Sequence, residues 1–118
     1  MEIAWRVELA VKPGQLDDFE KLTGEMVASA LNECGVLSYQ RFVSENEAQV
    51  HVYERYSSSA AALAHLENFK TRFATRFEAM VTRRQFTVFG QRDQALKVVL
   101  DRFGAVYLRP FGDFQYWA

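Results

Sequence analysis

The alternation of side chains near the N-terminus is the feature that most restricts how this chain can fold. Over residues 3–11 every second position is apolar, and these positions share one face: Ile3, Trp5, Val7, Leu9 and Val11. A period of two is typical of a β-strand that buries one face. Lys12, Pro13 and Gly14 end the pattern, because proline donates no ladder hydrogen bond and glycine permits a turn.

A helix and two further strands are predicted after this first strand. Residues 15–31 repeat apolar side chains at steps of three and four, which is typical of an amphipathic helix. Residues 36–43 and 48–56 alternate as strands do, and the polar residues 44–47 between them favour a hairpin.

A second helix and a fourth strand complete the pattern. Apolar positions recur at helical spacing from Ser59 to about Val81, with a break expected near Asn68, and residues 84–90 have the features of a strand. The resulting order, β-α-β-β-α-β, is the split βαβ arrangement of ferredoxin-like α+β domains. We therefore predict an antiparallel sheet with helices on one face.

A C-terminal extension follows this core. We predict a single domain over residues 1–118, with its core in 3–92 and an extension in 93–118. Within the extension, residues 93–103 predict a short helix and residues 105–110 a last strand. Aromatic side chains are frequent there and are expected to cover a sheet edge or reach a partner: Phe103, Tyr107, Phe111, Phe114, Tyr116 and Trp117.

Large side chains occupy both faces of the predicted sheet. On the third strand His51 and Tyr53 point away from Val50 and Val52, and on the fourth strand Phe89 points away from its apolar neighbours. Helices cover only one face, so the other face needs a second cover. Pairing of two copies would supply it, and we expect a homodimer that buries more than about 1,000 Å².

Composition excludes several classes of protein. The 118 residues include 14 Lys and Arg against 15 Asp and Glu, which excludes a strongly basic nucleic-acid binder. The single cysteine, Cys34, excludes an intramolecular disulfide framework and fits a reducing, cytoplasmic setting, where we expect a small buried side chain. No apolar run is long enough to span a membrane, and the N-terminus is unlike a signal peptide.

His65 is the candidate catalytic residue. It lies on the second predicted helix four residues before Phe69, so the two side chains share a face. A histidine titrates near neutral pH and can take a proton from a phenol or quinol. The alternative is a histidine packed between helix and sheet. The spacing of His51 and His65 predicts no metal site within one chain.

Aromatic side chains are the candidate substrate-binding residues. Trp5 is expected to face the helices, where its ring can stack on a planar substrate, and Tyr39 and Tyr53 can hold a substrate oxygen. Three phenylalanines are candidates for the wall of an apolar cavity: Phe69, Phe73 and Phe89. The alternative for this whole set is an ordinary core or interface.

Charged residues also occupy positions that the sequence pattern constrains. Glu54 needs a partner if its strand position is buried, and the candidate partners are Arg6, Arg41 and Arg55. Cations favour the C-terminal ends of helices, so a group of arginines near the end of the second helix is interpreted as a solvated face: Arg72, Arg76, Arg83 and Arg84.

Several short motifs together carry a resemblance. Residues 11–14 (Val-Lys-Pro-Gly) precede a helix, and residues 34–39 (Cys-Gly-Val-Leu-Ser-Tyr) enter the second strand. Residues 52–58 leave the third strand, and residues 61–66 (Ala-Ala-Leu-Ala-His-Leu) follow in the second helix. Over about residues 3–92 the chain resembles the antibiotic biosynthesis monooxygenase (ABM) family, whose members form dimeric α/β barrels.

The resemblance implies more than one activity. Some members of this family oxygenate quinols or phenols without metal or flavin, others degrade haem, and others isomerise or bind small molecules. The haem-degrading members use asparagine on the first strand, tryptophan on the second helix and a later histidine, where this chain has Val7, His65 and a position near Phe73. These three departures from the pattern argue against haem degradation by this chain.

The leading hypothesis is a cofactor-independent monooxygenase that acts on a small planar phenol or quinol. His65 would be its base or anion stabiliser, and no metal or other cofactor is expected. One alternative is a non-catalytic, small-molecule-binding or stress-related dimer of the same fold. Another is an isomerase-type enzyme that transfers a proton without using oxygen. All three functions occur on the same fold, so the fold does not distinguish them.

Overall fold

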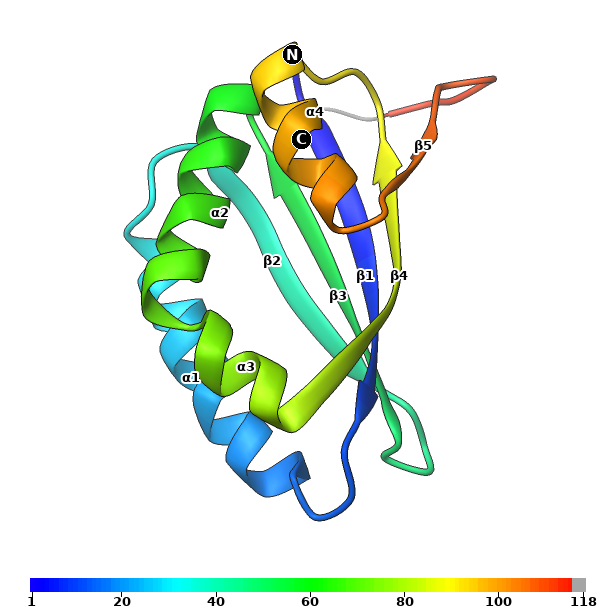
Figure 1. Cartoon of the computed structure of the whole chain (residues 1–118). Coiled ribbons are helices and arrows are strands. Elements are labelled where there is room, and N and C mark those ends of the chain that lie inside the picture. The colour runs from blue at the N-terminus through cyan, green and yellow to red at the C-terminus, as the bar shows by residue number, and fades with distance from the viewer. Residues whose placement is uncertain (116–118) are drawn as a thin grey trace.

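A five-stranded open sheet with helices on one face forms the molecule (Figure 1). The computed structural model describes residues 1–115. Its elements in chain order are β1 (Ile3–Val11), α1 (Leu16–Leu31), β2 (Val36–Val43), β3 (Gln49–Tyr56), α2 (Ser59–Arg72), α3 (Ala74–Met80), β4 (Val81–Phe89), α4 (Gln94–Arg102) and β5 (Val106–Leu108).

The sheet has the strand order β2-β3-β1-β4-β5. The first four strands are antiparallel, and β5 adds to the edge of β4 in parallel. This order confirms the predicted ferredoxin-like α+β fold with a C-terminal helix and strand. The sheet of one chain does not close into a barrel.

The predicted second helix is two helices in the structure. Phe73 leaves the helical conformation, with φ −126° and ψ −24°, so the break lies five residues beyond the expected position at Asn68. The change of direction allows both Phe73 and Phe77 to be buried. β4 begins at Val81 rather than at residue 84, because Val81 pairs with Val11 and is buried against the core.

The inner face of the sheet carries the core. Trp5 is fully buried at its centre, with its ring 4.7 Å from that of Tyr56 and 5.4 Å from that of Phe86.

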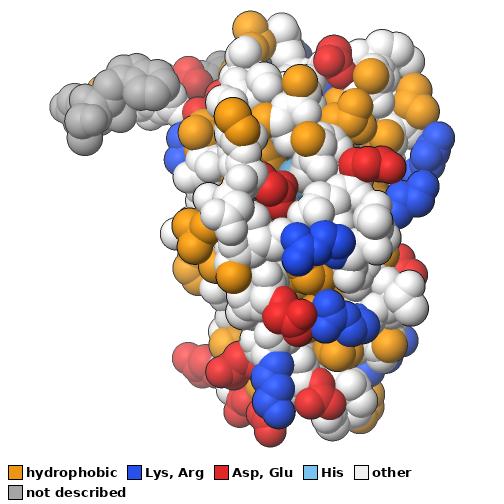
Figure 2. Space-filling view, turned by 90° about the vertical axis from the view of Figure 1, so that its left-hand side faces the viewer, with side chains coloured by type: hydrophobic (Ala, Val, Ile, Leu, Met, Phe, Trp, Pro, Cys, Tyr) orange, Lys and Arg blue, Asp and Glu red, His pale blue; other side chains and the backbone are white. Residues whose placement is uncertain are grey.

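On the helical side of the molecule, polar contacts join α1 to α2 and α3. Arg76 pairs with Glu25 at 2.9 Å. Figure 2 shows acidic, basic and apolar side chains mixed over the left-hand side of Figure 1.

The outer face of the sheet carries large exposed side chains, as the sequence predicts. Tyr53 and Phe89 stack with ring centroids 6.5 Å apart. The register places Ala4 beside Phe89, and His51 lies 3.7 Å from Glu8. We use the name outer patch for the apolar residues of this face: Phe42, Tyr53, Phe89, Val106 and Leu108.

The C-terminal extension packs its helix into the core. Asp93 caps α4 by accepting the backbone N–H of Leu96, and Leu96 and Leu100 are both fully buried. Phe103 stacks on Phe86, with ring centroids 5.4 Å apart. The extension therefore covers the β4 side of the inner face. Tyr116 and Trp117 lie outside the described residues.

The exposure of Cys34 and the apolar character of the helices can each be compared with the sequence. Cys34 is exposed at the turn after α1, so the expectation of a buried side chain is wrong. Across residues 1–115, none of the helices combines the length and the apolar character that crossing a bilayer requires.

Candidate active site

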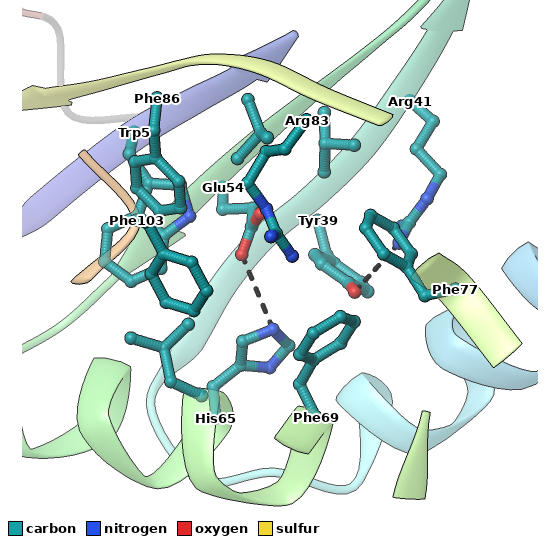
Figure 3. Close-up of a pocket in the computed structure, with 13 residues that line it drawn as sticks. Trp5, Tyr39, Arg41, Glu54, His65, Phe69, Phe77, Arg83, Phe86 and Phe103 are labelled. Atoms are coloured by element: carbon teal, nitrogen blue, oxygen red, sulfur yellow. Dashed lines mark hydrogen bonds and ion pairs between the residues drawn. The ribbon is translucent and has the colours of Figure 1, made fainter. Parts of the chain in front are cut away.

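A cavity of about 40 Å³ lies between the inner face of the sheet and α2 and α3 (Figure 3). Its apolar walls include Trp5, Val7, Leu66, Phe69, Phe77 and Phe86. Its polar side chains are Tyr39, Arg41, Glu54, His65 and Arg83. Because a water molecule needs roughly 10–15 Å³ of such space, an aromatic ring enters only if lining side chains move apart.

His65 stands between two carboxylates. Its Nδ1 lies 2.8 Å from Oε1 of Glu33, and its Nε2 lies 3.4 Å from Oε1 of Glu54 on the cavity side (Figure 3). The ring is buried and packs against Tyr39 and Tyr56, with centroid distances of 5.0 and 5.3 Å. A carboxylate only accepts hydrogen bonds, so Glu33 favours a proton on Nδ1, and Glu54, which lies farther away at 3.4 Å, is placed to accept from Nε2 when that nitrogen carries a proton.

A tight turn brings Glu33 to His65. Gly35 has φ +84°, and a methyl group there would lie 2.6 Å from Cβ of Ala61 on α2. The carbonyl of Gly35 accepts the backbone N–H of Ser57 at 2.9 Å, which ties the end of α1 to the start of α2. Asn68 donates to Oε2 of Glu33 at 3.1 Å, so both carboxylate oxygens are held.

Glu54 is buried on β3, and the groups that contact its carboxylate are a tyrosine hydroxyl and a histidine ring. The hydroxyl of Tyr56 donates to Oε1 of Glu54. The expectation of an arginine partner is wrong for Arg6 and Arg55, which face the other side of the sheet and pair with Glu8 and Glu2. Burial, followed by the charge of Glu54, raises the pKa of Tyr56 well above its ordinary value.

Tyr39 and Arg41 form one unit on β2. Nη2 of Arg41 donates to the Tyr39 hydroxyl at 2.8 Å, and the guanidinium lies 4.2 Å from the centre of the tyrosine ring. Burial, with a smaller contribution from the charge of Glu54, raises the pKa of Tyr39 to about 12. Tyr39 therefore remains a neutral hydrogen-bond donor at neutral pH.

The raised pKa of Tyr39 predicts a loss of stability in alkali. The buried neutral phenol contributes its full stabilisation of the folded state below the ordinary pKa near 10. This stabilisation is lost as the pH rises toward 12. Linkage gives a loss of about 1.4 kcal/mol in unfolding free energy at pH 11 from this group. We expect the Tyr39→Phe variant to show a smaller fall in its urea midpoint between pH 8 and pH 11 than wild type. An equal fall would contradict this assignment.

Arg83 enters the cavity because of a β-bulge. The pairing of β1 with β4 slips between Glu8 and Leu9, so that Leu9 faces Arg83 while Val7 faces Phe86. Strict alternation would turn Arg83 to the outer face, and the interpretation of Arg83 as solvated charge is therefore wrong. Its guanidinium lies 5.3 Å from the ring of Phe77 and 4.7 Å from that of Phe103. Burial lowers the pKa of Arg83.

The sequence model of the antibiotic biosynthesis monooxygenase family matches residues 3–83. The chain belongs to this family. A comparison with curated proteins finds no match.

Solved structures show the same fold. MupZ from Pseudomonas fluorescens is 19% identical with a TM-score of 0.85, and the similarity covers 98% of this chain and 94% of MupZ. SnoaB from Streptomyces nogalater, described as a cofactor-independent oxygenase, is 17% identical with a TM-score of 0.66, covering 79% and 95%. A putative antibiotic biosynthesis monooxygenase from Nitrosomonas europaea is 22% identical, with a TM-score of 0.66 and coverage of 76% and 89%. Because the similarity to MupZ covers 98% of this ABM-family chain, it includes most of the C-terminal extension.

The structure brings together only part of the candidate set. Trp5, Tyr39 and Phe69 line the cavity with His65. Tyr53 and Phe89 belong to the outer patch, because their strand positions alternate with the inward ones. Phe73 is buried at the break between α2 and α3, and it does not line this cavity.

Sequence reasoning missed Glu33 and misplaced Arg83, and it considered Tyr56 as a hydroxyl that could hold a substrate oxygen or fill an interface. The structure buries Tyr56 on the inner face, because it alternates with Val52 and Glu54 on a strand that buries one face. Glu33 lies beyond the end of α1 in a turn, and no periodicity reports on such a position. The inward position of Arg83 depends on the β-bulge, which the sequence pattern does not reveal. Within residues 1–115, no group of three or more metal-ligating side chains is arranged to hold a metal ion.

Proposed function

We propose that this ABM-family chain is a cofactor-independent monooxygenase that acts on a small planar phenol or quinol. The observation that carries the proposal is His65, a buried imidazole whose Nδ1 is held by Glu33 and whose Nε2 is directed toward an aromatic cavity. The family description and the fold shared with SnoaB, described as a cofactor-independent oxygenase, support oxygen chemistry.

The proposed reaction uses the electrons of the substrate. Nε2 of His65 takes the phenol proton, and the electron-rich anion passes one electron to dioxygen. The two radicals join through a new carbon–oxygen bond, and His65 returns its proton to the resulting peroxide. Loss of water then leaves a quinone, so that one phenol and one dioxygen give one quinone and one water. The substrate is oxidised and dioxygen is reduced.

Other lining residues have complementary roles in this proposal. Trp5 and Phe69 provide flat apolar surface for the ring, and Tyr39 offers a neutral hydroxyl to a substrate oxygen. The positive charges of Arg41 and Arg83 favour the anion formed when the proton leaves. Tyr53, Phe73 and Phe89 have no place in this cavity.

A second candidate function is proton transfer without oxygen. The observation that favours it is Glu54, whose carboxylate lies 3.4 Å from Nε2 of His65 in the same cavity. Two titratable groups on one side of a substrate can remove a proton from one atom and return it to another, as an isomerase requires.

We also propose that the chain works as a homodimer, joined through the outer patch to complete the α/β barrel of its family. Exposed Phe42 and the stacked pair of Tyr53 and Phe89 support this, because apolar surface of this kind is costly on a lone subunit. A lone subunit in sedimentation equilibrium at micromolar concentration would contradict it. The single cysteine fits a reducing, cytoplasmic compartment.

Oxygen consumption tests the proposed function. Wild-type protein is incubated with hydroquinone, 1-naphthol and 1,4-naphthohydroquinone in an oxygen-electrode cell, and quinone is followed by absorbance. The His65→Ala variant is compared with His51→Ala, which changes a histidine on the outer face. We expect uptake by wild type and His51→Ala, and its loss from His65→Ala.

The remaining outcomes separate the alternatives. Equal rates for wild type and His65→Ala would remove His65 from the mechanism. No uptake, together with His65-dependent exchange of solvent deuterium into a candidate ketone under nitrogen, would favour proton transfer. Neither uptake nor exchange, with binding of an aromatic probe, would favour a non-catalytic dimer.

A further inference from the structure

The cavity contains buried hydrogen-bond donors that lack acceptors. Within residues 1–115, Nε1 of Trp5 and both Nε and Nη1 of Arg41 are buried and have no hydrogen-bond partner. Leaving a buried donor unpaired costs about 1–3 kcal/mol, so such groups are rare in folded proteins. Both residues line the cavity, whereas a further unpartnered donor, Nε of Arg6, lies on the outer face of the sheet.

Arg83 adds a second guanidinium to the same cavity. It is flanked by the rings of Phe77 and Phe103. No acceptor from the described chain forms a hydrogen bond or ion pair with this guanidinium. Both rings lie within the range of a cation–π interaction, and the carboxylates of Glu78 and Glu54 act on the same guanidinium through their charges.

The acceptors of the cavity are fewer than its donors. Oε1 of Glu54 accepts from Tyr56 and lies near His65, and the hydroxyl oxygen of Tyr39 accepts from Arg41. Glu54 is the one carboxylate among the lining residues, so two arginines and an indole N–H line the cavity with a single negative charge. A ligand that satisfied these donors would supply at least two acceptor oxygens and a negative charge.

We propose that the cavity binds an aromatic carboxylate, with the carboxylate held by Arg41 or Arg83. This rests on the proposed function, because it names the substrate class of the same site: a hydroxyarene that carries a carboxylate. A carboxylate is planar and offers two oxygens to a guanidinium. It fits a narrow cavity between aromatic rings better than a tetrahedral phosphate. A neutral phenol would add no negative charge to a cavity in which one lining carboxylate, Glu54, stands against two guanidinium groups.

A matched pair of ligands tests the charge preference directly. 4-Hydroxybenzoate and 4-hydroxybenzyl alcohol have the same ring and hydroxyl, and only the first is an anion at pH 7. Isothermal titration calorimetry of the full-length protein is expected to show at least tenfold tighter binding of 4-hydroxybenzoate. The preference should fall as salt concentration rises, because part of it is electrostatic.

Variants locate the preference in the cavity. We expect Arg41→Gln or Arg83→Gln to lower the affinity ratio of the two ligands at least fivefold, with circular dichroism confirming the fold. The matched control is Arg72→Gln, which changes an exposed arginine that donates to Ser29 on the helical surface. The control should keep the wild-type ratio.

The outcomes distinguish this proposal from the proposed function. Equal affinity for the two ligands, with oxygen uptake from neutral quinols, would overturn the carboxylate inference and leave the monooxygenase proposal standing. A preference that survives in both cavity variants would also overturn it, because the anion would then bind elsewhere. Binding of neither ligand, with the donors satisfied by water alone, would overturn it as well.

Discussion

The Glu33→Gln variant is expected to lose about a hundredfold in kcat on the substrate found in the oxygen-uptake panel, with little change in KM. Glu33 does not itself line the cavity; it acts through His65, whose Nδ1 lies 2.8 Å from its carboxylate. An amide keeps the shape of this side chain and removes the negative charge that stabilises the imidazolium formed when Nε2 takes a proton. Glu33 is therefore a positioning residue.

A second measurement separates this role from a structural one. Nitrogen NMR of labelled histidine is expected to show His65 with its proton on Nδ1 in wild type, and a mixture of tautomers in Glu33→Gln. The control is Glu25→Gln on the same helix, where the carboxylate pairs with Arg76 at the surface. The assignment fails if Glu33→Gln keeps the wild-type kcat and the wild-type tautomer.

The fold was predictable because local patterns and topology agree. The alternation over β1 places Trp5 and Leu9 on one face, and both are buried as expected. The turn residues Pro13 and Gly14 mark the end of the strand. In each case the signal lies in adjacent residues, where burial, hydrogen bonding and turn chemistry act together.

The candidate site was predictable only in part, because it depends on exceptions to those patterns. His65, Trp5 and Tyr39 follow the regular period of their elements and were found. Arg83 faces the cavity only because β4 contains a bulge, and a bulge reverses the faces of all residues on one side of it. Glu33 reaches His65 through a turn that leaves no periodic signal.

Side-chain partners were the least predictable part. The sequence indicated that a buried Glu54 requires a partner, and basic residues were the natural candidates. The sheet instead turns Arg6 and Arg55 to the outer face and leaves Glu54 with Tyr56 and His65. Alternation states which face a residue occupies, but the identity of its neighbour depends on register, which only the folded sheet defines.

Truncation after Arg92 is expected to have the largest effect on stability. It removes Leu96 and Leu100, which are fully buried, and the ring of Phe103 that stacks on Phe86. Loss of a buried leucine costs about 2–5 kcal/mol, so the two together remove roughly 4 kcal/mol or more. Native domains have only about 5–15 kcal/mol in total. We therefore expect the fragment 1–92 to be largely aggregated, with strong binding of a hydrophobic dye by any soluble part.

A shorter truncation provides the control for this experiment. Removal of the chain after Pro110 keeps α4 and β5 and deletes a segment in which Phe111 is 96% exposed. Its urea midpoint is expected to stay near that of the full chain, because this truncation removes no buried leucine. A soluble, dimeric 1–92 fragment with the midpoint of the full chain would show that α4 is dispensable for the core. In that case the extension would cover the cavity without stabilising the fold.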